Sequence, residues 1–366
     1  MATLEEGITV ALGMAQRRLD WPRAVLERAV EEGAFPGYVA LVMWRGETVL
    51  QVAGGQAEIE PNPRPMRQDT IFDLASVTKV VAGSAAAHLA IERGYLSLDD
   101  RVQDWLPEYQ GLGKSDTLIW HLMTHTSGLP LVPELHHDFS TAAELRQAIF
   151  RQTLLAAPGT HYQYTCLGYH LLADIIEKAV GRPVDRFLHD ELYGPLGMND
   201  TLFRPEGEKV ERCAATEFCK WRGRVIRGEV HDENCYVLGG VSLNAGLFST
   251  AADVARYGQM LLNDGELDGV RIFSPSTVQA MFRNRTPHLA VSRSAGWGIS
   301  LPEFGDIIGP GSLGHTGFTG TSILLRPDLG LLVVLLTNRV HPSRWNYQID
   351  GVRRRFHNAV GAALCC

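Results

Sequence analysis

The chain has 366 residues, of which 45% are hydrophobic and 20% charged, so it is long and apolar enough to bury a large core. This composition excludes an intrinsically disordered protein and a small disulfide-stapled one. The net charge of −7 argues against binding nucleic acid by neutralising its phosphates. The longest apolar runs, 38–44 and 331–336, have the length of strands and are too short for a membrane span. We therefore predict neither a nucleic-acid nor a membrane partner.

The first residues and the cysteines indicate the compartment. The N-terminal Met-Ala-Thr-Leu-Glu-Glu is acidic where a secretory signal requires basic residues, so we expect a cytoplasmic protein. In that reducing compartment the cysteines are expected to be free thiols. Their spacing lacks the paired CxxC of a structural zinc site, and no metal is predicted. The six cysteines are Cys166, Cys213, Cys219, Cys235, Cys365 and Cys366.

The N-terminal quarter is predicted to form a helix, a β-hairpin and a second helix. Apolar residues share one face over 21–32, which indicates an amphipathic helix. Two runs rich in β-branched residues, 38–44 and 48–52, flank a turn and predict the hairpin. A segment rich in alanine and valine predicts a long helix over 76–93, ended by a glycine.

The middle of the chain, 95–290, is predicted to be mostly helical, with long loops. Caps or apolar spacing support helices over 117–123, 141–152, 167–180, 184–192 and 251–262. The segments 212–218 and 222–230 favour a small strand pair.

The C-terminal segment returns to strands. These are predicted over 296–301, 321–325 and 331–336, and a closing helix over 346–363. Sheet at both ends with helices between them predicts an α/β protein of the α+β type, with an antiparallel sheet flanked by helices. We expect residues 1–94 and 290–366 to form one lobe, residues 95–289 to form a mostly helical lobe, and a cleft to lie between the two lobes.

One pair of residues suggests nucleophilic chemistry. The chain has only five lysines, and one of them, Lys79, lies three residues after a serine, Ser76. At the start of the predicted helix these side chains would share one face, beside the free N–H groups of the first turn. A serine hydroxyl is a poor nucleophile until a neighbour accepts its proton. Lysine can do so if its pKa falls from about 10.4 toward 7.

Two later segments complete a pattern. Tyr164-Thr165-Cys166 precedes the helix predicted over 167–180, and Gly314-His315-Thr316-Gly317-Phe318 precedes the strand predicted over 321–325. The order Ser-x-x-Lys, Tyr-x-x, His-Thr-Gly resembles the serine β-lactamase and penicillin-binding-protein superfamily. It is most similar to the class C β-lactamase-related serine hydrolases, which include family VIII carboxylesterases and D-Ala-D-Ala carboxypeptidases. The resemblance runs over about 39–359 and implies the β-lactamase/transpeptidase-like fold.

The resemblance also implies roles for individual residues. Ser76 would be the acylated nucleophile, Lys79 its proton acceptor and Tyr164 the companion base. The backbone N–H groups of Ser76 and Phe318 would form the oxyanion hole, since backbone donors are preorganised. Other residues expected to bind substrate are Cys166, His315, Thr316 and Gly317. No cofactor is implied.

Two positions depart from the β-lactamase pattern. Cys166 stands where class C β-lactamases carry an asparagine that helps hold the acyl side chain of the substrate. A thiol is only a weak hydrogen-bonding group. His315 stands where they carry lysine, and histidine is mostly neutral at pH 7. We therefore predict an esterase or amidase for small-molecule esters or amides. A β-lactamase or D,D-peptidase, and a non-catalytic binding relative, are the alternatives. The oligomeric state stays open.

Other chemistries find less support in the sequence. No GxSxG elbow of a Ser-His-Asp hydrolase occurs. Cys166 has no histidine at an obvious spacing that would make it a nucleophile. His136-His137-Asp138 lacks a third metal ligand nearby in the sequence, so a polar loop is the simpler interpretation.

Overall fold

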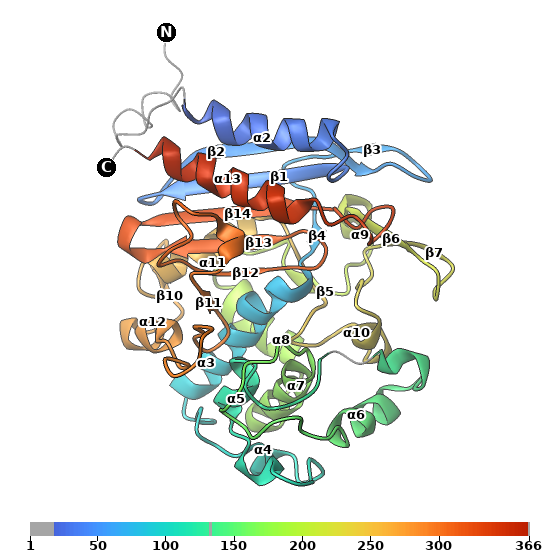
Figure 1. Ribbon diagram of the computed structural model, residues 1–366, viewed down its shortest axis with the longest axis vertical. Helices are drawn as coiled ribbons and strands as arrows, with labels where there is room; N and C mark the ends of the chain where they lie inside the picture. Colours follow the sequence, from blue (N-terminus) through green and yellow to red (C-terminus); the bar gives the residue numbers. More distant parts are fainter. Residues whose placement is uncertain (1–17, 132–133, 365–366) are drawn as a thin grey trace.

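The computed structural model describes residues 18–131 and 134–364, and a seven-stranded antiparallel sheet organises one end of it (Figure 1). The strand order is β11-β12-β13-β14-β1-β2-β3, so strands from both ends of the chain pair with each other. The bounds are β1 (Gly37–Trp44), β2 (Glu47–Glu58), β3 (Arg64–Pro65), β11 (Gly298–Ile299), β12 (Leu313–Thr316), β13 (Ser322–Arg326) and β14 (Leu331–Thr337).

The pairing of β1 with β14 joins the two ends of the chain at the centre of the sheet. All seven residues of β14 are buried, as expected for a strand covered on both faces. Along β1 the side chains alternate: Val39 and Leu41 enter one core cluster, and Tyr38 and Ala40 enter the other. The period of two thus builds a core on each side of the sheet.

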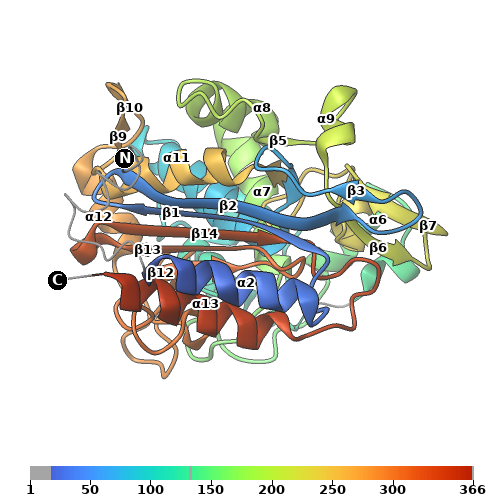
Figure 2. The same cartoon turned by 90° about the horizontal axis from the view of Figure 1, so that it is seen from above.

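Helices cover both faces of this sheet (Figure 2). On one face α2 (Asp20–Glu31) and α13 (Ile349–Ala363) pack side by side. On the other face α11 (Ala251–Leu262) packs against β14 and β1. The sheet is therefore the middle of three layers.

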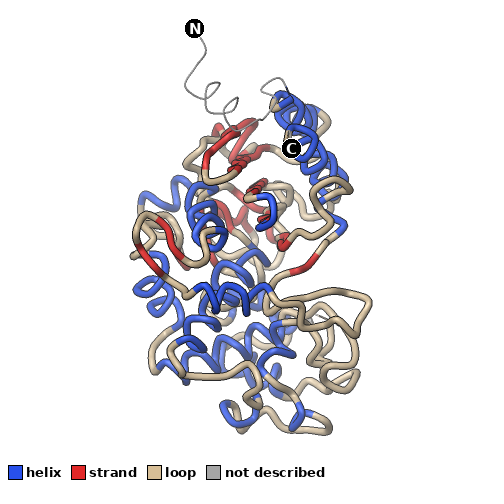
Figure 3. The backbone as a smooth tube through the Cα atoms, turned by 90° about the vertical axis from the view of Figure 1, so that its left-hand side faces the viewer, coloured by secondary structure: helices blue, strands red, loops and turns tan. Residues whose placement is uncertain are grey.

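Helices and loops fill the opposite end of the molecule (Figure 3). The helices outside the three layers are α3 (Ala85–Glu92), α4 (Val102–Trp105), α5 (Ile119–Met123), α6 (Ala142–Phe150), α7 (Leu167–Val180), α8 (Val184–Leu188), α9 (Glu208–Arg212), α10 (Glu233–Val237) and α12 (Pro275–Phe282). Three small sheets pair β4 (Phe72–Asp73) and β5 (Leu202–Phe203) with β8 (Leu247–Ser249), β6 (Ala215–Cys219) with β7 (Arg224–Arg227), and β9 (Glu266–Leu267) with β10 (Val270–Arg271).

The elements with strong apolar periodicity match their predicted ranges, and the short ones do not. The helices predicted over 167–180 and 251–262 match α7 and α11. Strand β12 was not predicted, because its Leu-Gly-His-Thr has no apolar run. The strand predicted over 296–301 shortens to the two residues of β11. The division into two lobes stays a prediction, and α11, predicted for the helical lobe, lies on the sheet.

The helix predicted over 76–93 is the clearest difference in local structure. A 3₁₀ turn, η2 (Ala75–Val77), leads into a π-helical turn, η3 (Lys79–Ser84), before α3 begins. A Cβ on Gly83, inside the π turn, would lie 2.8 Å from the Tyr169 ring. The sequence supplies glycine where this buried turn meets α7, and π turns often mark functional sites.

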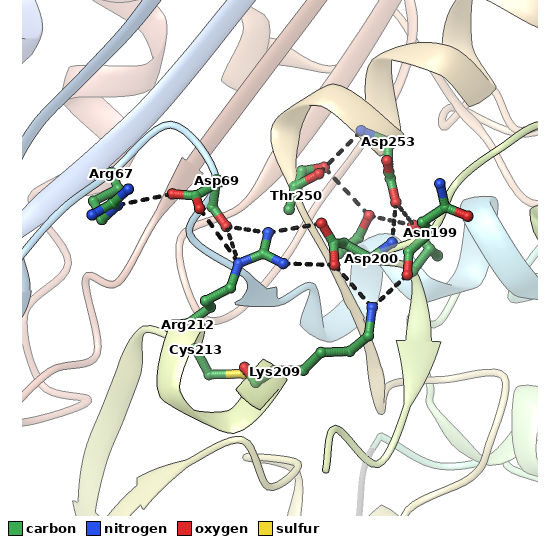
Figure 4. Close-up of polar contacts among 11 residues, drawn as sticks. Arg67, Asp69, Asn199, Asp200, Lys209, Arg212, Cys213, Thr250 and Asp253 are labelled. Atoms are coloured by element: carbon green, nitrogen blue, oxygen red, sulfur yellow. Dashed lines mark hydrogen bonds and ion pairs between the residues drawn. The ribbon is translucent and has the colours of Figure 1, made fainter. Parts of the chain in front are cut away.

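An ion-pair network fastens the segment that enters β4 (Figure 4). The Arg212 guanidinium donates to both carboxylate oxygens of Asp200, at 2.8 and 2.7 Å, and to the carbonyl oxygen of Asp69 at 2.8 Å. Lys209 Nζ donates to the same Asp200 carboxylate at 2.9 Å. Arg212 therefore lowers the pKa of the Asp200 carboxyl and ties the chain before β4 to the loop at 199–200.

Two further expectations concern thiols and membranes. Cys166, Cys213, Cys219 and Cys235 are free and buried, as predicted, and Cys365 and Cys366 lie outside the described residues. Over 18–131 and 134–364, no helix is both long and apolar enough to cross a bilayer.

Buried histidines predict how stability depends on pH. Burial lowers the pKa of His88, His121 and His170 to about 4, so these rings stay neutral in the folded protein. In the unfolded chain they protonate near pH 6.5, so stability should fall as the pH drops from about 6.5 toward 4, by up to about 1.4 kcal/mol per pH unit for each histidine. Urea unfolding at pH 7 and pH 5 should show a lower midpoint at pH 5.

A pair of variants makes this test specific. His170→Gln should flatten the pH dependence, whereas the same change at the exposed His189 should leave the slope as it is. Equal urea midpoints at pH 7 and pH 5 in the unmodified protein would contradict the prediction.

Candidate active site

Ser76 lies in the 3₁₀ turn that follows β4, and a buried carboxylate shapes this turn. Asp73 accepts the backbone N–H of Ala75 at 2.8 Å and that of His231 at 2.7 Å. Ala75 has φ +45°, a conformation that costs energy for a residue with a Cβ. The strained residue directly before Ser76 is thus held by a hydrogen bond to Asp73.

The His-Thr-Gly segment is fastened to the same turn from the other side. Thr319 Oγ1 donates to the Asp73 carbonyl and Thr321 Oγ1 to the Leu74 carbonyl, both at 2.8 Å. Position 317 requires a glycine, because a Cβ there would lie 2.1 Å from Thr321 Oγ1 and 2.5 Å from the Leu74 carbonyl oxygen. Strand β12 and the turn carrying Ser76 are therefore in direct contact.

Lys79 is fully buried and its ammonium contacts three partners. Nζ donates to Ser76 Oγ at 3.0 Å, to the Asn244 carbonyl oxygen at 3.0 Å and to Cys166 Sγ at 3.5 Å. It also lies 5.1 Å from the centre of the Tyr164 ring. The structure thus brings Ser76, Lys79, Tyr164 and Cys166 together, although they are up to 90 residues apart in the sequence.

The pKa of Lys79 is raised above its ordinary value. Burial alone lowers it, but Cys166 and a hydrogen-bonded Tyr164 favour the charged form and together outweigh burial. Burial raises the pKa of the Cys166 thiol and keeps that thiol neutral at pH 7. The direction of the Lys79 shift is thus opposite to the fall of its pKa toward 7 that the sequence argument required.

Aromatic rings enclose Tyr164. The ring of the buried His125 packs against it with centres 4.4 Å apart, and His125 Nδ1 lies 3.0 Å from the Thr165 carbonyl oxygen. His125 has φ +60°, so this contact is built on strained backbone. Burial lowers the pKa of His125 well below its usual value, which keeps the ring neutral.

His315 lies behind the site, away from the cavity surface. It is 4% exposed, its ring centre is 6.2 Å from that of Tyr164, and Nδ1 lies 2.8 Å from the Thr316 carbonyl oxygen. Burial, and then the positive charges of Arg293 and Lys79, lower the pKa of His315 well below 6.5. A carbonyl oxygen only accepts, so Nδ1 carries the proton of this neutral ring.

Ser76 and several other predicted residues line a cavity of about 540 Å³. The predicted residues on its wall are Ser76, Tyr164, Cys166, Thr316, Gly317 and Phe318. Lys79 and His315 are absent from this wall, because both side chains are buried behind it. Charged side chains also line the cavity, among them Glu233, Arg339, Arg344 and Arg353.

One side-chain cluster beside this cavity has the composition of a metal site. Ligand atoms of Glu217, Cys219 and Glu233 lie within 4.8 Å of one another. Arg344 donates to the carboxylates of both Glu217 and Glu233. Its guanidinium already pairs with both carboxylates, so we interpret the cluster as an ion-pair network rather than a cation site.

Several residues of the site were missed in the sequence. The Asp73 carboxylate accepts the N–H of Ala75, next to Ser76, and the Asn244 main-chain carbonyl accepts from Lys79, a role that any sequence position can serve. Arg293 is 2% exposed, and its charge acts on His315 and His125. Nothing distinguishes it from the other arginines in the sequence, because only folding brings it to the site.

Comparisons with known proteins identify the family of this chain. The family model described as Beta-lactamase matches residues 22–354. The chain is 30% identical over 376 residues to a putative D-alanyl-D-alanine carboxypeptidase of Escherichia coli (strain K12), covering 92% of this chain and 86% of the relative. It is 31% identical over 357 residues to the one of Salmonella agona (strain SL483), covering 87% and 82%.

Solved structures show the same fold. EstCE1, a hydrolase with promiscuous acyltransferase activity, matches with a TM-score of 0.75 at 23% identity over 94% of this chain and 99% of that chain. A family VIII carboxylesterase matches with a TM-score of 0.74 at 22% identity, over 95% and 98%. The fold class predicted from the sequence, β-lactamase/transpeptidase-like, is thereby confirmed, and the chain belongs to the β-lactamase family of serine hydrolases.

Proposed function

We propose that this protein hydrolyses small esters and amides through an acyl-enzyme formed on Ser76. The observation that carries the proposal is the contact of 3.0 Å between Lys79 Nζ and Ser76 Oγ, at the wall of a cavity that can admit a small molecule. A buried lysine is costly to keep, and here its ammonium is directed at a serine hydroxyl.

The proposed reaction has two halves. Ser76 Oγ attacks the substrate carbonyl, and the N–H groups of Ser76 and Phe318 bind the oxyanion. The proton of Ser76 leaves through the Lys79–Tyr164 pair. Because an ammonium cannot accept a proton, the pair first releases one proton to solvent, and the neutral Lys79 amine then takes up that of Ser76. The same pair protonates the leaving alcohol or amine. Water then cleaves the acyl-enzyme by the reverse proton path and releases the acid.

The cavity favours simple esters over β-lactams. Cys166 lines the cavity where an amide side chain would hold an acylamide group, and its neutral thiol is a weak partner. His315 is neutral and lies behind the wall, so it offers no cation to a β-lactam carboxylate. A short ester needs neither contact, only the nucleophile, the proton pair and the oxyanion donors.

A D,D-carboxypeptidase is the second candidate. The relatives at 30% and 31% identity are named as putative enzymes of this kind. A peptide carboxylate would need a cation, and Arg344 and Arg353 line the cavity. Arg344 is already paired with Glu217 and Glu233, and Arg353 with Asp350. Arg339, which also lines the cavity, donates to main-chain carbonyl groups, so all three arginines are already engaged, which weakens this candidate.

A non-catalytic binding relative is distinguished from an enzyme by covalent labelling. We expect a fluorophosphonate probe to modify Ser76 in the folded protein, as peptide mapping would show, because the probe forms a covalent bond with an activated serine. Folded protein that stays unlabelled at Ser76 would favour the binding relative.

Replacement of the catalytic pair should abolish turnover. Ser76→Ala removes only the hydroxyl, so p-nitrophenyl butyrate hydrolysis should fall to background while the thermal unfolding curve is kept. Lys79→Ala should lower kcat by roughly 10²-fold or more, the usual contribution of general base catalysis. A loss below about threefold would assign Lys79 a structural role, since it is far smaller than general base catalysis provides.

The substrate preference is tested by comparing leaving groups and acyl groups. We expect kcat/KM for p-nitrophenyl acetate or butyrate to exceed that for nitrocefin after division by the uncatalysed rate of each substrate. Two lost polar contacts of about 1–3 kcal/mol each correspond to roughly 10²- to 10⁴-fold. A corrected preference for nitrocefin, or for a D-Ala-D-Ala peptide, would replace the esterase assignment by the corresponding alternative.

Substitution at position 166 should shift this preference. Cys166→Asn restores an amide beside Lys79, so it should narrow the gap between ester and nitrocefin, and adding His315→Lys should narrow it further. Cys166→Ser is the matched control, since it changes polarity without supplying an amide. Equal effects of Asn and Ser at position 166 would show that amide recognition is not what this position controls.

A further inference from the structure

Arg339 is a buried arginine without an acidic partner. It lies two residues after β14, is 4% exposed and lines the wall of the active-site cavity. Within the described part of the chain, no carboxylate oxygen lies within 4.0 Å of its guanidinium. Burying an unpaired charge is costly unless other groups satisfy its donors, so the contacts that Arg339 makes instead are informative.

The guanidinium donates hydrogen bonds to main-chain carbonyl groups. Nε donates to the Phe318 carbonyl oxygen at 2.7 Å, and Nη1 donates to those of Arg344 and Asn346, both at 2.8 Å. The backbone N–H of Arg339 donates to the Thr319 carbonyl oxygen at 3.1 Å. Arg339 thus joins the end of β14, the turn at 318–319 and the loop at 344–346.

Two aromatic rings lie close to the Arg339 guanidinium. Its carbon lies 4.3 Å from the centre of the Phe318 ring and 5.2 Å from that of Tyr347. The ring of His231 contacts Phe318 as well, with centres 5.5 Å apart. Gly320 gives the arginine stem its space, because a Cβ there would lie 2.7 Å from Arg339 Cγ. Both the ring and the carbonyl group of Phe318 are therefore fixed.

Phe318 is the residue whose N–H would bind the oxyanion in the proposed function. On its N-terminal side the Gly317 N–H donates to Thr321 at 2.7 Å, and on its C-terminal side Arg339 binds the Phe318 carbonyl. We propose that Arg339 is a positioning residue of the oxyanion hole, whose guanidinium fixes the main chain of Phe318 and thereby the direction of its N–H. The inference rests on the proposed acyl-enzyme at Ser76.

The planar fork of arginine, rather than its charge, is what this role requires. One guanidinium must reach the carbonyl oxygens of Phe318, Arg344 and Asn346 while it also contacts two aromatic rings. Lysine keeps the positive charge but offers a single compact donor group that stacks less well. Arg339→Lys therefore separates positioning of the main chain from a general electrostatic effect, which lysine would preserve.

The test combines catalysis with binding of a transition-state analogue. Arg339→Lys and Arg339→Ala are compared with the control variant Arg256→Lys. Arg256 Nε also donates to a main-chain carbonyl oxygen, that of Leu196 at 2.6 Å, but Arg256 does not line the cavity. The measurements are kcat and KM for p-nitrophenyl butyrate, and the inhibition constant of phenylboronic acid. The boronate formed on Ser76 places an oxygen in the oxyanion hole, whereas KM reports mainly on ground-state binding.

Both Arg339 variants should lose kcat by roughly 10- to 100-fold with KM changed less than about threefold, since a displaced oxyanion donor acts on the transition state. The inhibition constant of phenylboronic acid should rise by a similar factor. Methylguanidinium, but not methylammonium, should restore part of kcat to Arg339→Ala, because only the former supplies the planar donor. Arg256→Lys should match the unmodified protein.

Three results would overturn the proposal: kcat within threefold of the unmodified protein in Arg339→Lys, a loss of kcat with an unchanged phenylboronic acid constant, or loss of cooperative unfolding in both variants. The last would assign Arg339 to global stability. Fluorophosphonate labelling of Ser76 keeps the two proposals apart. If Ser76 is not labelled, the proposed acyl-enzyme is contradicted. If Ser76 is labelled and the Arg339 variants keep full activity, only the positioning role of Arg339 is refuted.

Discussion

The burial of the Lys79 ammonium is the constraint on which the site depends. A charge out of contact with water must be met by acceptors, and here they come from three distant segments: Ser76 Oγ, the Asn244 carbonyl and Cys166 Sγ. The contact with Ser76 Oγ that satisfies Lys79 also directs it at the proposed nucleophile. The folding requirement and the proposed catalytic arrangement therefore coincide, and a shift of these segments would leave the buried ammonium with fewer partners.

The sheet gives these segments a rigid frame. Pairing of β1 with β14 joins the two ends of the chain. Strands β13 and β12 continue the sheet beyond β14, and the His-Thr-Gly segment begins within β12. Thr319 and Thr321 then bind the main chain just before Ser76. Ser76 and the proposed oxyanion donor Phe318 are thus positioned by hydrogen bonds from two threonine hydroxyls to the main chain of a short turn, which suits groups that must not reorganise during reaction.

The sequence predicts what depends on local pattern and leaves out what depends on packing. Ser76 and Lys79 were recognisable because lysine is rare in this chain and the pair lies at the start of an apolar helix. Strand β12 could not be recognised in the sequence. It has no apolar periodicity, and its extended form depends on its pairing with β13. The burial of His315 and the charge of Arg293 beside it arise only from tertiary structure. The same holds for the raised pKa of Lys79, which depends on neighbours 85 or more residues away in the sequence.

The electrostatics of the site follow from which buried groups carry charge. His125 and His315 stay neutral, because burial and the positive charges of Arg293 and Lys79 oppose their protonation. The cation nearest the Tyr164 ring is Lys79, whose Nζ lies 5.1 Å from the centre of that ring. Positive charge in this position would stabilise the oxyanion of a tetrahedral intermediate in the proposed reaction. The neutral His315 adds no charge to this field. The arginines that line the cavity are bound to carboxylates or to main-chain carbonyl groups, Arg344 and Arg353 to the former and Arg339 to the latter. The proposed site is therefore suited to charge that develops during reaction more than to charge that a substrate already carries.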